Sequence, residues 1–225
     1  RGATFTKVAN AITVAVREGG GGDPASNFKL RLIADQARAV NMPKDNIQRA
    51  IDRGLGKGSE GMQLSSVTYE GYGPGKVALV IEAVTDNKNR TTPEVKNTLE
   101  KSGGSFVAPG TVSWMFADCG LITVSKGGKS FDGLFEAAVD AGAEDVEDSD
   151  DAVEVYTKPN ELDKVKNALS EKGLEIQNAG LAKRATTTVE IADEETQKRI
   201  FDVMERLEDL EDVQKVWNNF NIIES

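Results

Sequence analysis

The sequence predicts a multidomain α+β protein: an N-terminal helical bundle followed by two α+β domains, the third ferredoxin-like and inserted into the second. Three observations predict it. Apolar residues recur at the helical period of 3.6 through residue 58, the period changes to two near residue 66, and residues 121–179 follow the order βαββαβ. The predicted domains are 1–60, then 61–118 together with 186–225, and the insertion 119–185.

The first domain is predicted to contain three helices. An apolar stripe over residues 5–16 forms the first, and the glycine run at 19–22 ends it, because four glycines have too much backbone freedom to stay helical. Asp23-Pro24 and Ser26 both favour the start of a second helix, with a buried stripe over residues 30–40. Pro43 opens the third helix.

The rest of the chain alternates strands and helices. Before the insertion we expect strands at 67–72 and 77–85, a polar loop at 86–90, a helix at 93–102 and a strand at 111–116. The insertion is predicted to contain strands at 121–125, 144–148, 152–157 and 174–179, a helix at 131–141 with Phe135 and Val139 inward, and a helix at 159–172. A strand at 187–191, a helix at 194–207 with Phe201 inward and a strand at 213–218 are expected to continue the first sheet.

Composition excludes several classes of chemistry. The 225 residues are 39% hydrophobic, enough for a packed core, but include no His and a single Cys. Ser-His-Asp and Cys-His catalysis, a His-ligated metal and a Cys-rich zinc site are therefore excluded. We expect no cofactor and no metal. A lone Cys cannot form an internal disulfide, which favours a reducing compartment, the cytoplasm. The longest apolar run, residues 77–81, is far shorter than the roughly 20 residues that span a bilayer, so we expect no membrane contact.

Charge is distributed unevenly along the chain. The net charge is −10, which taken alone argues against nucleic-acid binding. However, residues 1–58 contain ten basic and five acidic residues, a net +5, and the remaining residues carry −15. Such polarity indicates a cationic helical end on an acidic body, although a chance bias among solvated faces would give the same count.

Several motifs resemble binding sites but fit simpler structures better. Residues 71–77 lack both the earlier Gly and the following Ser or Thr of a phosphate loop, and a hairpin turn is favoured. Residues 144–151 are acidic but lack the central Gly of a calcium loop, and a solvated hairpin tip is favoured. The glycine-rich stretches 19–22 and 54–61 are typical of hinges, with phosphate binding as the alternative. The loop at 86–90 is either a donor-rich phosphate or sugar contact or a capped loop before a helix.

Basic residues of the helical segment are the best candidates for function. They can neutralise phosphates and release condensed counterions, and the scarcity of aromatic residues there favours contacts with the nucleic-acid backbone. The competing interpretation is local pairing, because Asp45 and Arg49 lie four residues apart on the predicted third helix. The predicted contact residues are Lys7, Arg17, Lys29, Arg31, Arg38, Lys44, Arg49, Arg53, Lys57, Lys88 and Arg90.

Eight segments of the sequence resemble the YebC/PmpR family, which includes the mitochondrial translational activator of cytochrome oxidase subunit I. The matching segments are FTK at 5–7, AVREGG at 15–20, NMPKDNI at 41–47, YEGYGPG at 69–75, TDNKNR at 85–90, GTVSWMF at 110–116, AGAED at 141–145 and LEDLEDVQ at 207–214. The resemblance implies the same three-domain fold and no enzymatic activity. Family members usually begin with a further basic stretch, and since this chain begins at Arg1 rather than Met, we expect such a stretch upstream.

The resemblance implies two kinds of role, DNA-binding transcriptional regulator or ribosome-associated translation factor. We therefore expect a cytoplasmic, monomeric regulator of gene expression whose partner is DNA or ribosomal RNA, with the ribosome as a possible host. The acidic body disfavours a long duplex and favours a ribosomal site. The alternative is a small-ligand sensor built from tandem ferredoxin-like modules, since fold alone does not decide function.

Overall fold

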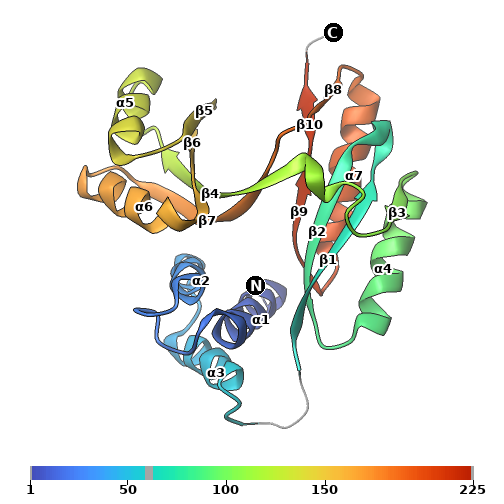
Figure 1. Ribbon diagram of the computed structural model, residues 1–225, viewed down its shortest axis with the longest axis horizontal. Coiled ribbons are helices and arrows are strands. Elements are labelled where there is room, and N and C mark those ends of the chain that lie inside the picture. Colours follow the sequence, from blue (N-terminus) through green and yellow to red (C-terminus); the bar gives the residue numbers. More distant parts are fainter. Residues whose placement is uncertain (1, 59–62, 224–225) are drawn as a thin grey trace. The chain divides into compact units, whose positions relative to one another are not determined.

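A computed structural model describes residues 2–58 and 63–223 (Figure 1). It contains two compact units, one formed by Arg1–Ala117 with Ala185–Ser225 and the other by Asp118–Arg184. The predicted domain boundary at residue 60, and the end of the glycine-rich stretch 54–61, lie outside the described residues. The division of the first unit into two domains stays a prediction.

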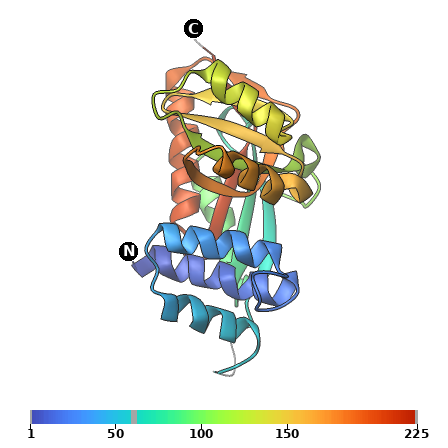
Figure 2. The same cartoon turned by 90° about the vertical axis from the view of Figure 1, so that its left-hand side faces the viewer.

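The three predicted helices are confirmed, as α1 (Gly2–Gly19), α2 (Phe28–Ala39) and α3 (Lys44–Gly54). Helix α1 packs against both α2 and α3 (Figure 2). The start signal of α2 is Asn27 rather than Ser26, because the Asn27 side chain accepts the Leu30 N–H at 3.1 Å. Val40, expected in the buried stripe, follows the end of α2 and is 41% exposed.

A glycine allows α1 and α3 to approach closely. A Cβ at Gly54 would lie 2.6 Å from the Val16 Cβ and 2.7 Å from the Thr13 carbonyl oxygen. The buried Thr13 hydroxyl also bonds to the Ala50 carbonyl oxygen at 3.0 Å. Backbone contact of this kind fixes how the two helices cross, and therefore fixes the groove that lies between them.

The α+β part of the first unit is built on a four-stranded sheet with the order β3-β1-β2-β9 (Figure 1). Its strands are β1 (Ser65–Tyr72), β2 (Ala78–Thr85), β3 (Ser105–Val107) and β9 (Val213–Asn218), and its helices are α4 (Lys88–Lys101) and α7 (Glu194–Asp209). Leu79 and Ile81 of β2 share one core with apolar residues of both helices. The intervening Val80 joins a smaller cluster with Val112, because successive side chains of a strand point to opposite faces.

The hairpin turn predicted at 71–77 is confirmed. Strands β1 and β2 pair antiparallel, and the Gly73 N–H donates to the Val77 carbonyl oxygen at 2.8 Å across a 3₁₀ turn, Pro74–Lys76. Gly75 adopts a φ of 70°, which a glycine enters without a steric penalty.

Three predictions for this region are wrong. Helix α4 begins at Lys88 rather than at 93, so the polar loop is short and Pro93 lies inside the helix. The strand expected at 111–116 is absent from the described residues before Phe116, and a 3₁₀ turn, Ser113–Met115, takes its place. The strand expected at 187–191 is β8 (Val189–Ile191), and it pairs in parallel with β10 (Phe220–Ile222) rather than extending the first sheet. Strands β3 and β10 were not predicted.

The second unit has the ferredoxin-like topology that its element order predicts. Its strands lie in the order β5-β6-β4-β7. The elements are β4 (Phe116–Ser125), α5 (Phe131–Ala141), β5 (Asp145–Ser149), β6 (Ala152–Thr157), a 3₁₀ turn at Pro159–Glu161, α6 (Leu162–Glu171) and β7 (Ile176–Ala185). The acidic segment at 144–151 forms the hairpin of β5 and β6, as expected. Among residues 2–58 and 63–223, no cluster of metal-ligating side chains occurs.

Three helix residues expected to point inward are exposed. Phe135 and Val139 on α5 are 41% and 50% exposed, and Phe201 on α7 is 52% exposed. Phe201 instead contacts the Phe220 ring edge-on, at a centroid distance of 5.4 Å. In the described ranges, no helix combines the length and apolar character needed to cross a membrane.

Candidate nucleic-acid interface

A groove of about 510 Å³ lies between α1 and α3 in the helical part. Its apolar lining comes from the α1 stripe, from Met42 just before α3 and from Ala50 on α3, and its polar lining is mostly basic. The lining residues are Phe5, Thr6, Ala9, Met42, Asn46, Arg49, Ala50, Arg53 and Lys57. No acidic residue is among them.

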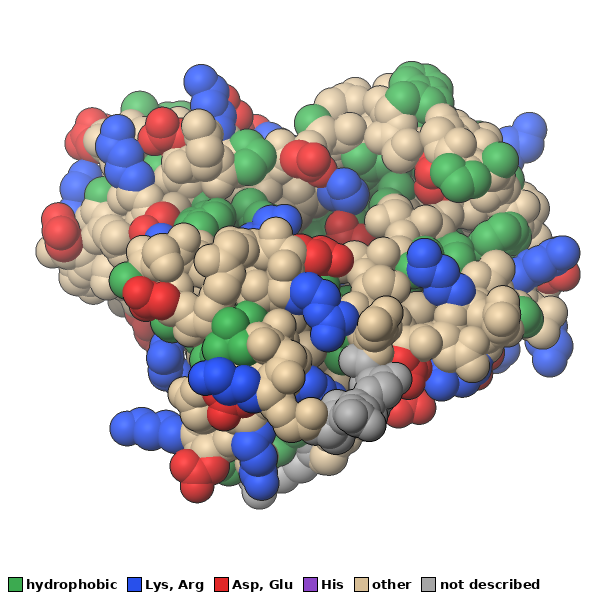
Figure 3. Space-filling model, turned by 60° about the horizontal axis from the view of Figure 1, so that its bottom comes forward, with side chains coloured by type: hydrophobic (Ala, Val, Ile, Leu, Met, Phe, Trp, Pro, Cys, Tyr) green, Lys and Arg blue, Asp and Glu red, His purple; other side chains and the backbone are tan. Residues whose placement is uncertain are grey.

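Three predicted contact residues meet at this groove. Arg49 and Arg53 lie one helical turn apart on α3, and Lys57 follows four residues later, just after the helix ends. The Arg49 guanidinium donates to the Asn46 side-chain oxygen, a neutral acceptor. Within the described residues, neither Arg53 nor Lys57 forms an ion pair. Figure 3 shows the molecule from the side that brings α3 forward, with Lys and Arg side chains interspersed with Asp and Glu.

The acidic residues of α3 do not neutralise this row. Asp52 accepts a hydrogen bond from the Gln48 side-chain nitrogen at 3.0 Å, one turn earlier on the helix. Asp45 forms no ion pair with Arg49 in the described residues, and it lies in the first turn, where a negative charge interacts favourably with the helix dipole. The three cations therefore keep their charge available to an anion that enters the groove.

Lys29, Lys44 and Arg38, further basic residues of α2 and α3, differ in whether they form an ion pair. Lys29 and Lys44 are exposed and form no ion pair in the described part of the chain. Arg38 is also exposed, but pairs with Asp35 at 2.8 Å on its own helix.

The side chain of Arg31 is held by contacts with neighbouring residues of its own segment. Its guanidinium donates to the Pro24 carbonyl oxygen at 2.7 Å and to that of Ala25 at 3.4 Å, and it lies 5.7 Å from the centre of the Phe28 ring. These contacts connect α2 to the turn that precedes it. A phosphate would have to compete with them.

Lys7 and Arg17 connect α1 to the α+β part of the same unit. The Lys7 ammonium donates to the Glu208 carbonyl oxygen at the end of α7, and the Gln214 side chain donates to the Lys7 carbonyl oxygen at 3.0 Å. Burial lowers the pKa of Lys7 below its ordinary value, against the opposing charges of Glu208 and Asp209. Arg17 donates to the Leu64 carbonyl oxygen at 2.8 Å. Both side chains therefore hold the helices in place.

Arg90 is the centre of a second structural network. Its guanidinium donates to the buried Asp212 carboxylate, with 2.9 Å from Nη2, and to Asp86 at 2.9 Å. The hydrogen bonds to Asp212 and then Asp86 raise the pKa of Arg90 above its ordinary value, and burial opposes them more weakly. Asp212 also accepts the Thr91 hydroxyl at 2.6 Å.

The capped-loop interpretation of residues 86–90 is therefore confirmed. The Asn87 side chain caps α4 by accepting the Asn89 N–H at 3.1 Å. Of the two basic residues of this loop, Lys88 is exposed without an ion pair among the described residues, whereas Arg90 connects α4 to the segment that leads into β9.

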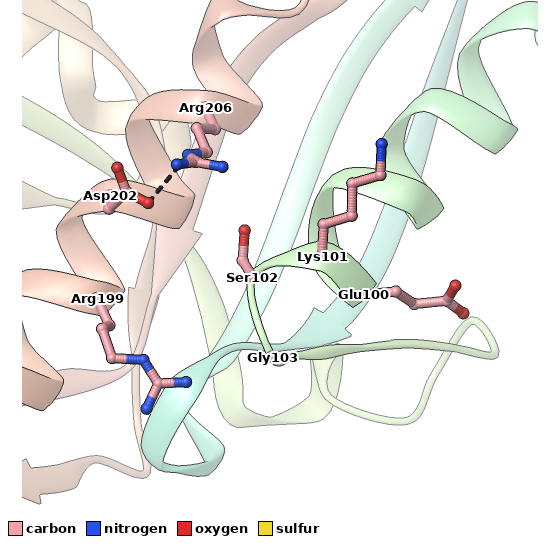
Figure 4. Close-up of a pocket in the computed structure, with 7 residues that line it drawn as sticks. All are labelled: Glu100, Lys101, Ser102, Gly103, Arg199, Asp202 and Arg206. Carbon is pink, nitrogen blue, oxygen red and sulfur yellow. Dashed lines mark ion pairs between the residues drawn. The ribbon is translucent and has the colours of Figure 1, made fainter.

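A second hollow, of about 410 Å³, lies between the end of α4 and α7 (Figure 4). Its lining residues are Glu100, Lys101, Ser102, Gly103, Arg199, Asp202 and Arg206. Charges of both signs face it, and Arg206 pairs with Asp202 at 3.0 Å. This hollow is therefore a weaker anion site than the groove between α1 and α3.

The sequence predicted Arg49, Arg53 and Lys57 as contact residues but not the apolar residues that line the groove with them. Phe5 and Ala9 were assigned to the buried stripe of the first helix, and in the structure they are half-buried and line the groove. The signal that could have separated the groove from the other basic residues is the spacing of four residues between 49, 53 and 57.

The chain matches known proteins over its whole length. Residues 1–57 match the model of the TACO1/YebC protein N-terminal domain, and residues 64–220 match that of the TACO1/YebC second and third domain. A protein of Roseiflexus castenholzii named probable transcriptional regulatory protein is 52% identical over 99% of this chain and 88% of its own length. A similarly named protein of a Sulfurihydrogenibium species is 50% identical over 100% and 89%. The crystal structure of a conserved hypothetical protein from Aquifex aeolicus, 43% identical, superposes with a TM-score of 0.92 over 100% of this chain and 92% of that one. The chain belongs to the TACO1/YebC family.

Proposed function

We propose that this protein regulates gene expression without catalysing a reaction, by binding a nucleic-acid backbone in the groove between α1 and α3. The observation that carries the proposal is the row formed by Arg49, Arg53 and Lys57, which faces the groove without an acidic partner in the described chain. Each cation that meets a phosphate releases condensed counterions, and this release is the main driving force of such binding. The names of the relatives agree with a regulatory role.

Ribosomal RNA suits the charge distribution better than a long DNA duplex. Residues beyond 58 carry a net −15, and a duplex that extends past the groove would be repelled by them. A folded RNA site needs to face only the cationic helical end. Ribosome profiling with and without the gene distinguishes the roles: altered pausing at particular codons supports translation, whereas unchanged pausing with altered promoter output supports transcription.

The groove is tested by removing its charge. We expect the triple variant Arg49→Gln/Arg53→Gln/Lys57→Gln, called the groove variant below, to bind an RNA oligonucleotide more weakly in a fluorescence anisotropy titration. If three phosphate contacts are lost, the slope of log K against log salt becomes shallower by about 2.7 for a duplex and about 2.1 for a single strand.

A matched control removes the same charge elsewhere. Lys96→Gln/Lys101→Gln/Lys198→Gln replaces three exposed lysines of α4 and α7 and changes the net charge equally. We expect this control to keep the native slope within about 0.5, because non-specific charge acts over a Debye length of about 8–10 Å and is screened beyond it. Equal slopes for the two variants would contradict a contact at the groove.

The small-ligand sensor remains the alternative. A thermal-shift screen of the full chain against amino acids and nucleotides tests it, because a ligand that binds the folded state raises the melting temperature. A large shift with one metabolite, together with no affinity for nucleic acid, would favour sensing over the proposed function.

A further inference from the structure

Trp114 is the most exposed of the large hydrophobic residues that the structure describes, with 64% of its surface accessible. It lies in the segment GTVSWMF at 110–116, which the groove does not use. The indole N–H donates to the Thr111 carbonyl oxygen at 2.9 Å. The polar atom of the ring is therefore satisfied internally, and the aromatic faces are what the side chain offers to a partner.

The loop that carries Trp114 is held by a buried carboxylate. Glu70 of β1 is 4% exposed, and it accepts the backbone N–H groups of Gly110 at 2.5 Å, Val112 at 2.8 Å and Ser113 at 2.7 Å. Burial of the carboxyl opposes its ionisation, but these three bonds outweigh burial and lower the pKa of Glu70. A charged acceptor with several backbone donors makes strong hydrogen bonds.

Packing on both sides of Trp114 completes the support. Val112 is fully buried against Ala78 and Val80, and Met115 and Phe116 pack on the same cluster. The Met115 carbonyl oxygen accepts the Thr186 N–H at 2.7 Å. The backbone before and after Trp114 is therefore fixed, and an exposed ring on a fixed backbone loses little conformational entropy when a partner covers it.

The neighbours of Trp114 distinguish the kind of partner. Gly110, Thr111 and Ser113 are exposed beside the ring and are small or hydroxylated, so polar groups border it. Aromatic anchors of protein interfaces lie in well-packed apolar centres. An unpaired nucleobase needs a flat aromatic face for stacking and polar groups at its margin for its edge, which is the arrangement found here.

We infer that the loop held by Glu70 presents Trp114 as a stacking platform for an unpaired nucleobase. This inference rests on the proposed function and sharpens it, because a stacking platform requires a single-stranded or looped segment and not a regular duplex. The groove would then hold the backbone of the nucleic acid, and Trp114 would select segments whose bases are accessible.

Fluorescence quenching tests the platform in the full chain. Trp217→Phe leaves Trp114 as the only tryptophan, which excitation beyond the tyrosine absorption band observes selectively. The Trp217 indole nitrogen, which is buried without a partner in the described residues, loses no hydrogen bond in this variant. We expect an unstructured RNA oligonucleotide to quench the emission and a blunt duplex of equal length to leave it unchanged. Quenching by an unstructured peptide and not by RNA would overturn the inference and assign the ring to a protein partner.

Binding measurements give the second readout. Trp114→Ala is expected to weaken binding of unstructured RNA by between about 5-fold and about 150-fold, the range for loss of one stacked base, and Trp114→Phe should retain most of the affinity. Neither change should alter the salt slope or the affinity for a duplex. Salt-dependent RNA binding that Trp114→Ala leaves intact would overturn the platform alone, whereas the absence of any nucleic-acid binding by the native chain would overturn the proposed function as well.

Discussion

Two basic segments of this chain look alike in the sequence but have different surroundings in the structure. Arg90, in the segment TDNKNR, meets two carboxylates, one of them buried. Arg53, on α3, lines a groove with Arg49 and Lys57 and has no ion pair within the described residues. The comparison shows that a cation is available to a ligand only where the fold leaves it without an acidic partner, which a charge count along the chain does not reveal.

The largest effect is expected from the partner of Arg90. Asp212→Ala removes the buried one of the two carboxylates that pair with Arg90, and with it one acceptor of the Thr85 and Thr91 hydroxyls. We expect the free energy of unfolding to fall by about 2–4 kcal/mol, at the lower end because Arg90 is partly exposed to solvent. Urea denaturation followed by circular dichroism measures it.

Asp86→Ala is the matched control for that experiment, because Asp86 pairs with the same guanidinium from a more exposed position. It should cost about 0–1 kcal/mol. Equal losses for the two variants would show that the buried network around Asp212 does not hold α4 in place.

The next effect concerns the close approach of α1 and α3. Gly54→Ala places a methyl group against the Val16 side chain and the Thr13 carbonyl oxygen, so we expect a loss of about 1–3 kcal/mol of stability and weaker RNA binding, since the groove depends on this crossing. Gly2→Ala is the control, because a Cβ there has no neighbour within 4 Å. A native melting temperature for Gly54→Ala would contradict the predicted clash.

A smaller effect concerns pH and the loop of Trp114. Because hydrogen bonding lowers the pKa of Glu70 in the folded state, its contribution to stability is present above the unfolded value of about 4.3 and is lost as the pH falls through the folded value. We expect Glu70→Gln to reduce stability by about 1–2 kcal/mol at pH 7 and to flatten the acid limb of a plot of the urea midpoint against pH. The exposed Glu190→Gln serves as control, and identical acid limbs in the native chain and Glu70→Gln would argue against the role of this carboxylate.

The smallest effect on stability is expected from the groove variant itself. Its three side chains make no ion pair in the described residues, so their replacement should change the free energy of unfolding by less than about 0.5 kcal/mol. A loss of nucleic-acid binding in a protein of native stability separates function from folding. A loss of several kcal/mol would place these cations with Arg90 among the structural residues.

Sequence patterns predicted the helices and most strands because a local period fixes which face of each element is buried. The patterns failed where a side chain that is distant in the sequence accepts hydrogen bonds from backbone N–H groups that a strand would otherwise use. Glu70 accepts the N–H groups of Gly110, Val112 and Ser113 and so prevents the strand expected at 111–116. Pro93 suggested a helix start, yet Asn87 had already capped α4 six residues earlier.

In the candidate site, too, the sequence does not reveal which distant groups each side chain contacts. All eleven predicted contact residues are basic, as the sequence states, but only the fold shows that Arg31, Lys7 and Arg17 bond to backbone carbonyls. Trp114 was part of a recognised motif, and its exposure depends on the buried Glu70, forty residues or more away along the chain. Long-range partners of this kind carry no periodic signal in the sequence.

The salt dependence of RNA binding by the full chain and by the groove variant tests the central claim most directly. We expect the native chain to show a steep slope of log K against log salt. This slope should become shallower by about two to three units when Arg49, Arg53 and Lys57 lose their charge, while folding stays intact. Native affinity and an unchanged slope in that variant would contradict it.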